Sequence, residues 1–257
     1  MWKAVRITLL LFILAGAAIA TWLDRVATQS WHETLWVGIY PLNGDGTEAA
    51  ERYIASLKPS DFTDIEAFFA REAPRYGVKL EQPVHIELYP EGAKLPPLLP
   101  PGSGALGVIW WSLKVRWFAA RAAAVPGRAP PRIRLFVLYH DPSTLDRVPD
   151  SHGLQKGLIG IVYAFADRSL ATRNDIVIAH ELLHTVGASD KYDLATGAPL
   201  YPNGFGDPQA QPLYPQSDAE IMAGRRALSA QSFEMPGSLR NVVVGPATAL
   251  EIRWSHP

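Results

Sequence analysis

The chain has 257 residues, enough for one domain of ordinary size or for two small ones. Hydrophobic residues make up 48% of the sequence and charged residues 19%, which excludes a disordered polar chain and predicts a folded core. The 24 basic residues nearly balance the 25 acidic ones, so we expect no nucleic-acid partner. The chain contains no cysteine, which excludes thiolate metal sites, iron–sulfur clusters and disulfides. Any bound metal must therefore be held by His, Asp or Glu.

Residues 1–23 form a hydrophobic N-terminal segment. Two basic residues precede Ile7–Leu23, a stretch of seventeen residues without a charge. As a helix it would be about 25 Å long, a little short of a hydrocarbon core of about 30 Å. We expect a signal anchor, with a cleaved signal peptide as the alternative because Ala18-Ile19-Ala20 has the small-x-small pattern of a cleavage site. The rest of the chain would then lie outside the cytoplasm, tethered to the cell membrane by a single pass, or secreted or periplasmic after cleavage.

Residues 34–257 are predicted to form one domain, because strand-like and helix-like runs alternate with no repeat and no long linker. The predicted strands are Leu35–Tyr40, Val84–Leu88, Arg132–Tyr139, Gly157–Phe165 and Asn241–Val244. Helices are predicted from about Thr47 and over Asp61–Arg75, Ala105–Ala124 and Pro246–Trp254. Four prolines and two glycines in Lys94–Gly104 predict a loop. Three basic residues in the aromatic-rich stretch from residue 105 to 124 argue against a second membrane span there.

The stretch Thr172–Asp193 contains the residues with the clearest chemical pattern. Thr172 and Asp175 match a capping box that would start a helix there, with Asp in place of the usual Glu. Apolar residues then recur at helical spacing at Ile176, Ala179, Leu183 and Val186. The sequence therefore predicts an amphipathic helix that packs on the core.

His180 and His184 are four residues apart, so in a helix both imidazoles lie on one face and can bind one ion. Glu181 follows the first of them, where a carboxylate can deprotonate a metal-activated water. The pattern continues as HExxHxxGxxD: Gly187 can end the helix and turn the chain back, and Asp190 can then be the third ligand. Three protein ligands leave one position for water, as in a catalytic zinc site. A metal-free surface turn with hydrogen-bonded imidazoles is the simpler alternative.

At these residues the chain resembles the metzincin clan of zinc metallopeptidases, whose signature is HExxHxxGxxH followed by a methionine turn. It departs from the signature at Asp190, as the snapalysin-like branch does. Ala219–Gly224 would supply the methionine turn through Met222, thirty-two residues after Asp190. The resemblance implies an α+β, zincin-like single domain: a mixed sheet with an edge strand, and an active-site helix above an irregular C-terminal subdomain. It also implies one zinc ion per chain.

Two other acids remain candidates for the third ligand. Glu220 would suit a gluzincin arrangement, and Asp193 could instead hold a ligand imidazole through a hydrogen bond. Tyr192 is a candidate oxyanion or substrate contact, with a tyrosine that only packs the turn as its alternative. In the resembling family the strand before the active-site helix is an edge strand that binds extended peptides, a role that would fall to Gly157–Ala164 here.

The expected function is that of an exported zinc-dependent endopeptidase in which His180, His184 and Asp190 hold zinc and Glu181 is the general base. Its partners would be a peptide or protein substrate and, through the N-terminal segment, the membrane. Two alternatives use the same residues. One is a noncatalytic zinc-bearing domain for binding or assembly in the cell envelope, and the other is a zinc hydrolase of a nonpeptide amide.

Overall fold

The computed structural model describes residues 2, 5–8, 11–12, 15–16, 28–89, 95–100, 102–122, 127, 129–145, 147–149, 151–154 and 158–255. Most of the hydrophobic segment Ile7–Leu23, and with it the predicted anchor or signal peptide, lies outside these residues. Among the residues described, no helix combines the length and the apolar character that a membrane span requires.

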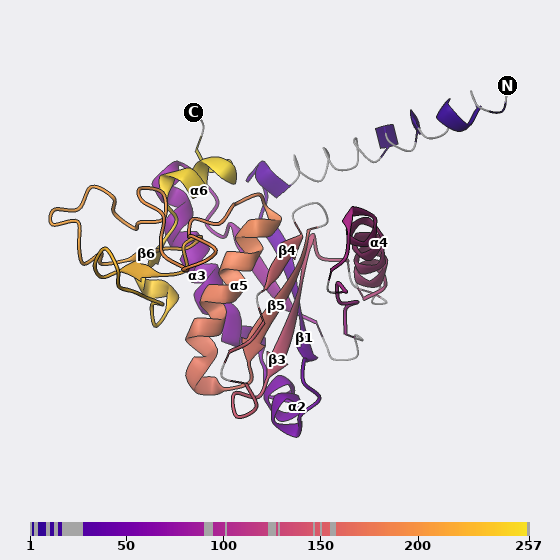
Figure 1. The fold of residues 1–257 in the computed structure, drawn as a ribbon, viewed down its shortest axis with the longest axis horizontal. Helices are drawn as coiled ribbons and strands as arrows, with labels where there is room; N and C mark the ends of the chain where they lie inside the picture. Colours follow the sequence, from indigo (N-terminus) through magenta and orange to yellow (C-terminus); the bar gives the residue numbers. More distant parts are fainter. Residues whose placement is uncertain are drawn as a thin grey trace.

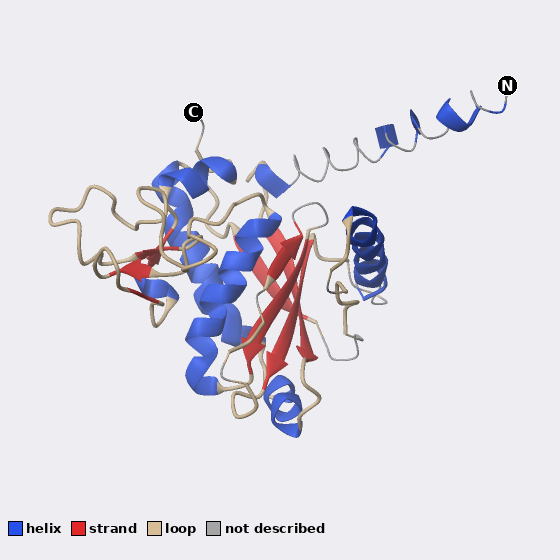
Figure 2. Ribbon diagram, viewed as in Figure 1, coloured by secondary structure: helices blue, strands red, loops and turns tan. Residues whose placement is uncertain are grey.

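The centre of the molecule is a five-stranded mixed sheet with the strand order β2-β1-β3-β5-β4 (Figures 1 and 2). Its strands are β1 (Leu35–Asn43), β2 (Val84–Leu88), β3 (Ile133–His140), β4 (His152–Leu154) and β5 (Ile159–Phe165). β2, β1, β3 and β5 run parallel, and the short β4 pairs antiparallel with β5. The fold is thus a mixed α/β architecture built on a mainly parallel sheet.

The prediction that Gly157–Ala164 forms an edge strand is wrong. β5, the strand before the helix that contains His180 and His184, has β3 along one side and β4 beside Ile159–Ile161 on the other, so it is not at the edge of the sheet. Gly153 of β4 lies opposite Gly160 of β5 in this pairing. The chain between β3 and β5 folds back to place β4 outside β5, and three residues are too short to predict as a strand from sequence. β4 is the edge strand on this side.

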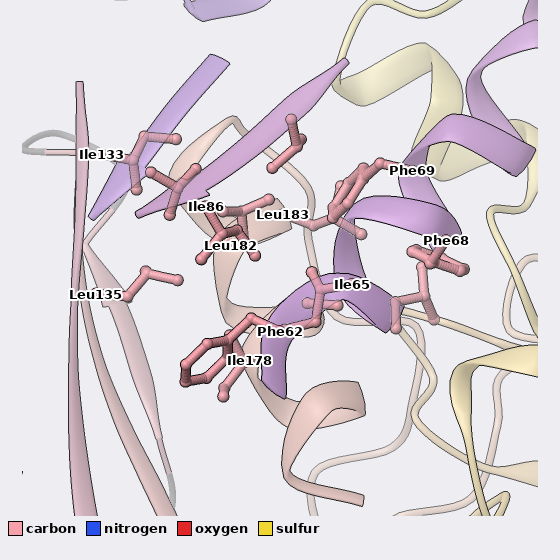
Figure 3. Close-up of a cluster of buried hydrophobic side chains, with 14 of the residues drawn as sticks. Phe62, Ile65, Phe68, Phe69, Ile86, Ile133, Leu135, Ile178, Leu182 and Leu183 are labelled. Atoms are coloured by element: carbon pink, nitrogen blue, oxygen red, sulfur yellow. The ribbon is translucent and has the colours of Figure 1, made fainter. Parts of the chain in front are cut away.

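Helices cover both faces of the sheet. They are α2 (Glu48–Ala55), α3 (Thr63–Glu72), α4 (Ala105–Ala122), α5 (Ala171–Thr185) and α6 (Pro246–Glu251). Alternate side chains of β3 point to opposite faces, as the period of a strand requires. Ile133 and Leu135 pack in one core with α3 and α5, while Phe136 and Leu138 pack in another with α4. Figure 3 shows the first core, where apolar side chains of α3 and α5 meet those of the sheet.

The helix predicted over Asp61–Arg75 is divided into three parts. α3 is preceded by a 3₁₀ turn over Pro59–Phe62 and followed by another over Ala73–Tyr76. Pro74 lacks the N–H that would continue the α-helical hydrogen bonds, so the helix continues as a tighter 3₁₀ turn. This turn ends at Gly77, which has a φ of 83°.

The C-terminal part from Val186 onward has little regular structure, as expected from its prolines and glycines. It contains the short strands β6 (Ala219–Glu220), β7 (Arg226–Ala227), β8 (Phe233–Glu234) and β9 (Val242–Val243). β6 pairs with β9, and β7 pairs with β8. Trp31 donates its Nε1–H to the carbonyl of Ile252 at 2.7 Å, and the Gln29 side chain donates to the carbonyl of Val186. The folded core therefore extends upstream of residue 34.

Candidate metal centre

Helix α5 places both histidines, but it begins differently from the prediction. The helix starts at Ala171, so Thr172 lies inside its first turn and donates its hydroxyl to the carbonyl of Gly237 at 2.7 Å. A 3₁₀ turn precedes the helix, and the Asp167 side chain caps that turn by accepting from the N–H of Ser169. The predicted capping box is therefore wrong, because a tertiary contact uses the hydroxyl that would have capped the helix. The predicted apolar stripe is buried in the core along its length.

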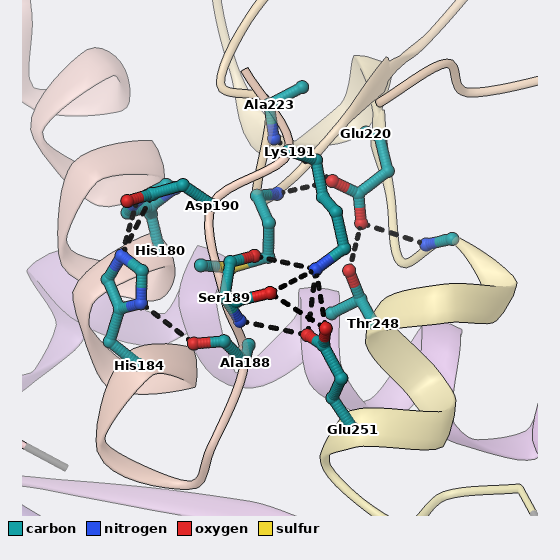
Figure 4. A network of polar contacts seen from close by, with 12 residues as sticks. His180, His184, Ala188, Ser189, Asp190, Lys191, Glu220, Ala223, Thr248 and Glu251 are labelled. Atoms are coloured by element: carbon teal, nitrogen blue, oxygen red, sulfur yellow. Dashed lines mark hydrogen bonds and ion pairs between the residues drawn. The ribbon is translucent and has the colours of Figure 1, made fainter. Parts of the chain in front are cut away.

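Three ligand-type atoms converge beside the C-terminal end of α5 (Figure 4). The Nε2 atoms of His180 and His184 are 3.0 Å apart. Asp190 Oδ1 lies 3.2 Å from the first and 3.1 Å from the second. In a tetrahedral site with zinc–nitrogen distances of about 2.0–2.1 Å, ligand atoms are roughly 3.3 Å apart. The spacing therefore fits the coordination of one small cation.

Both imidazoles are fixed in the form that binds a metal through Nε2. His180 Nδ1 is 2.9 Å from the carbonyl oxygen of Ile221, and His184 Nδ1 is 2.9 Å from that of Ala188. A carbonyl oxygen only accepts hydrogen bonds, so each Nδ1 carries the proton and each Nε2 keeps its lone pair in the neutral ring. Carbonyl partners of this kind also fix the orientation of the rings.

The turn after α5 brings Asp190 to the histidines. Gly187 has a φ of 112°, a conformation that side chains other than glycine rarely adopt. The N–H groups of Gly187 and Ala188 donate to the carbonyls of His184 and Leu183, at 3.2 and 3.0 Å, which satisfies two of the free carbonyls at the helix end. Gly187 thus ends the helix and reverses the chain toward the two histidines, as the sequence predicted.

The residues on both sides of Asp190 are held by Glu251 of α6, a contact that the sequence did not reveal (Figure 4). Lys191 Nζ lies 2.8 Å from Glu251 Oε2, and Ser189 donates to the same carboxylate through its N–H at 2.8 Å and its hydroxyl at 2.7 Å. The Lys191 side chain is only 7% exposed. No short-range pattern links Glu251 to residues about sixty positions earlier.

Glu220 is turned away from the histidines and is fully buried in its own network. Its carboxylate accepts from the N–H groups of Met222, Ala223 and Gly245 at 2.6, 3.0 and 3.1 Å, and from the hydroxyl of Thr248 at 2.6 Å. These bonds hold the turn over residues 221–224, whose carbonyl groups support the site. Ile221 accepts from His180, and the fully buried Met222 accepts from the N–H of Lys191 at 3.0 Å. The gluzincin alternative for Glu220 therefore does not fit the structure.

Asp193 and Tyr192 lie on the segment that follows Asp190. Asp193 Oδ1 accepts from the N–H groups of Ala195 and Thr196, at 3.1 and 2.8 Å, and so caps a local turn. The prediction that it could hold a ligand imidazole does not fit this arrangement. The ring of Tyr192 lies 6.4 Å from that of His180, centroid to centroid, at the wall of the cavity described below.

The charges of the centre favour an ionised aspartate. Burial by itself raises the pKa of Asp190, but the hydrogen bonds to His180 and His184 outweigh it and hold the pKa well below its usual range. Burial by itself lowers the pKa of His180, but the neighbouring Asp190 and Glu181 outweigh it, so this pKa is raised. A divalent cation would replace the proton that these groups otherwise share.

His180, Glu181 and His184 form a group that could hold a metal ion, since each offers a ligand atom within 4.8 Å of the others. The Asp190 carboxylate lies closer to both imidazoles than this limit. The Glu181 side chain is buried, with 4% of its surface exposed. The arrangement can thus supply three close ligands and one further carboxylate beside them.

A cavity of about 490 Å³ opens beside Asp190. Its lining includes Tyr192, Gly224 and Arg225, together with Ser151, which directly precedes the edge strand β4. A pocket of this size is in the range that binds a small molecule or a peptide side chain.

The chain was compared with models of known protein families, and none matches. A search of curated proteins likewise gives no match.

Proposed function

We propose that the protein is a zinc metallopeptidase of the metzincin type, with His180, His184 and Asp190 as the zinc ligands. The observation that carries the proposal is the convergence of two Nε2 lone pairs and one carboxylate oxygen within 3.0–3.2 Å. Zinc is the metal that imidazole and carboxylate ligands most often hold in such three-ligand catalytic sites. The glycine turn and the buried Met222 behind the histidines also support the metzincin assignment.

Glu181 is proposed as the general base. When bound, zinc polarises the scissile carbonyl and lowers the pKa of water toward neutrality. Glu181 takes a proton from the attacking water and returns it to the leaving nitrogen, so one carboxyl group serves both halves of the reaction. The low pKa of Asp190 keeps that carboxylate ionised at neutral pH and available to the cation.

The substrate is proposed to be a peptide in extended conformation. β4 is the edge strand beside β5, and the cavity lining includes the residue that precedes it. A peptide added to such an edge is recognised mainly through its backbone, while the cavity accepts a side chain. In the proposed arrangement the domain lies outside the cytoplasm, tethered by the hydrophobic N-terminal segment.

Metal analysis and peptide cleavage on purified full-length variants test the proposal. The wild type should contain one zinc per chain and cleave members of a mixed peptide library, as detected by mass spectrometry of fragments. Glu181→Gln should retain zinc and lose cleavage, since the amide cannot accept the proton.

The ligand assignment is tested with two aspartates of the same segment. Asp190→Ala should weaken zinc binding by several orders of magnitude, because a direct ligand is lost. Asp193→Ala is the matched control and should bind zinc as the wild type does. Asp190→His should restore much of the affinity. A wild type without zinc, or equal zinc affinity in Asp190→Ala and Asp193→Ala, would contradict the proposal.

A further inference from the structure

Helix α4 is apolar on two opposite sides. Trp111, Val115 and Ala119 point inward and pack on the sheet. Five large apolar side chains on the other side are between 54% and 84% exposed, namely Leu106, Ile109, Trp110, Leu113 and Trp117. They recur every three or four residues, so they form one continuous stripe along the helix, which we call the outer stripe. A helix with two apolar sides is normally covered on both of them.

The loop before α4 also exposes apolar side chains. Leu95, Leu98 and Leu99 are also exposed, and Trp111 holds the loop against the helix by donating its Nε1–H to the carbonyl of Pro97 at 2.6 Å. A contiguous exposed apolar stripe such as the one on α4 marks an interaction site rather than ordinary surface. α4 and α5 pack in the cores on opposite faces of the sheet, so this surface is separate from the metal centre.

The charged residues of α4 are all basic. Lys114, Arg116 and Arg121 flank the outer stripe at helical spacing, and α4 contains no acidic residue. Two of these cations lie over tryptophan rings: Lys114 Nζ is 5.7 Å from the Trp110 ring centre, and the Arg121 guanidinium carbon is 4.4 Å from that of Trp117. A partner must therefore bury apolar groups and offer negative charge at the border. A second α4 brings only more positive charge, whereas an anionic lipid surface meets both requirements.

The first residues of the folded part of the chain line a cavity together with residues that follow α4. Thr28 lines this cavity together with Ala129 and Pro130. The hydrophobic N-terminal segment ends in the sequence at Leu23, five residues before Thr28. A membrane-bound N-terminal segment would thus hold this part of the molecule near the bilayer.

We propose that the outer stripe of α4 docks on an anionic lipid surface. Its apolar side chains enter the boundary between headgroups and acyl chains, its tryptophans lie at headgroup level, and its three cations contact lipid phosphates. The docking is independent of the proposed zinc chemistry.

The absence of cysteine allows a direct test on the full chain. Leu113→Cys places one spin label in the outer stripe, and Leu194→Cys, at a side chain 82% exposed in the segment after the metal centre, is the matched control. Each labelled protein is reconstituted in vesicles of phosphatidylcholine with phosphatidylglycerol, or of phosphatidylcholine alone. Electron paramagnetic resonance then compares the access of lipid-soluble oxygen with that of a water-soluble nickel complex. Circular dichroism confirms that the variants are folded.

With anionic vesicles, we expect the label at position 113 to be accessible to oxygen and protected from nickel, and the label at 194 to show the reverse. Replacing Lys114, Arg116 and Arg121 by glutamine should lower the docked-to-undocked ratio about fivefold per cation. Equal nickel access at both positions would overturn the proposal. Broadening between labels at 113 would show self-association instead, and protection from both reagents would show a protein segment over the stripe. Equal docking on both vesicle types would refute the role of the cations.

Discussion

Replacing the buried carboxylate of Glu220 tests how the turn beneath the histidines is held. Each of its oxygens accepts two hydrogen bonds: Oε2 from the N–H groups of Met222 and Ala223, and Oε1 from the N–H of Gly245 and the hydroxyl of Thr248. In Glu220→Gln the amide oxygen can keep one of these pairs. The amide NH₂ can donate to the Thr248 hydroxyl, but it cannot accept from Gly245.

The substitution thus leaves one buried N–H without an acceptor and replaces charged hydrogen bonds by neutral ones. An unpaired buried donor costs about 1–3 kcal/mol, so we expect Glu220→Gln to lower the free energy of unfolding by roughly 3 kcal/mol. Glu220→Ala leaves all four donors without the carboxylate, at a cost of about 4–12 kcal/mol. That is comparable with the whole stability of a typical domain, about 5–15 kcal/mol, so this variant should be largely unfolded.

Urea denaturation of the metal-free chain measures the loss of stability. Zinc titration of Glu220→Gln measures whether the substitution also weakens zinc binding. Because Ile221 next to Glu220 orients His180, zinc affinity should fall by about 10- to 100-fold, as for a group that supports a ligand. Glu234→Gln is the matched control: this residue forms a partly exposed ion pair with Arg226, worth about 1 kcal/mol or less. Unchanged stability in Glu220→Gln would refute the reasoning, and complete loss of zinc with unchanged stability would make Glu220 a ligand.

Three further predictions concern the pH dependence of stability, the backbone conformation at Gly187 and the removal of the metal. Burial, with neighbouring acids adding to it, raises the pKa of Asp175 from its ordinary value of 3.8 to about 7, so the wild type should lose stability as the pH rises between these two values. The difference in free energy of unfolding between Asp175→Asn and the wild type should therefore shift in favour of the variant by at most about 4 kcal/mol from pH 4 to pH 8. Urea denaturation at both pH values measures this difference. A shift in favour of the wild type as the pH rises would contradict the prediction. Gly187→Ala should lower the free energy of unfolding by about 1–2 kcal/mol and weaken zinc binding, because φ at this position is 112°. Gly237→Ala is the control and should change neither quantity, because a Cβ at this position meets open space. Removing zinc with a chelator should lower the melting temperature of the wild type but not that of Asp190→Ala, and equal shifts in scanning calorimetry would argue against Asp190 as a ligand.

Much of the candidate site is encoded locally and could be predicted. His180 and His184 share a face because four residues make about one turn of a helix, and Gly187 permits the backbone conformation that returns Asp190 to them. The main strands were predicted for a similar reason, because apolar and β-branched runs indicate them directly. The resemblance to metzincins added the expectation of a mixed sheet with an edge strand.

The tertiary structure decided the features that depend on distant parts of the chain. It placed β4 rather than β5 at the sheet edge, and it used the Thr172 hydroxyl for a contact with Gly237 instead of a helix cap. It also assigned Glu220 to the support of the turn and paired Lys191 with Glu251. Each of these groups can form several alternative hydrogen bonds of similar strength, and which one forms depends on the neighbour that folding brings within about 3 Å.

The same division holds for α4. The sequence predicted an aromatic-rich helix here and placed three basic residues in it. Only packing on the sheet decided that Trp111 and Val115 are covered while Trp110 and Leu113 face outward. A periodic pattern specifies which side chains share a face, but the burial of that face depends on the surface opposite it, which is contributed by other elements of the fold.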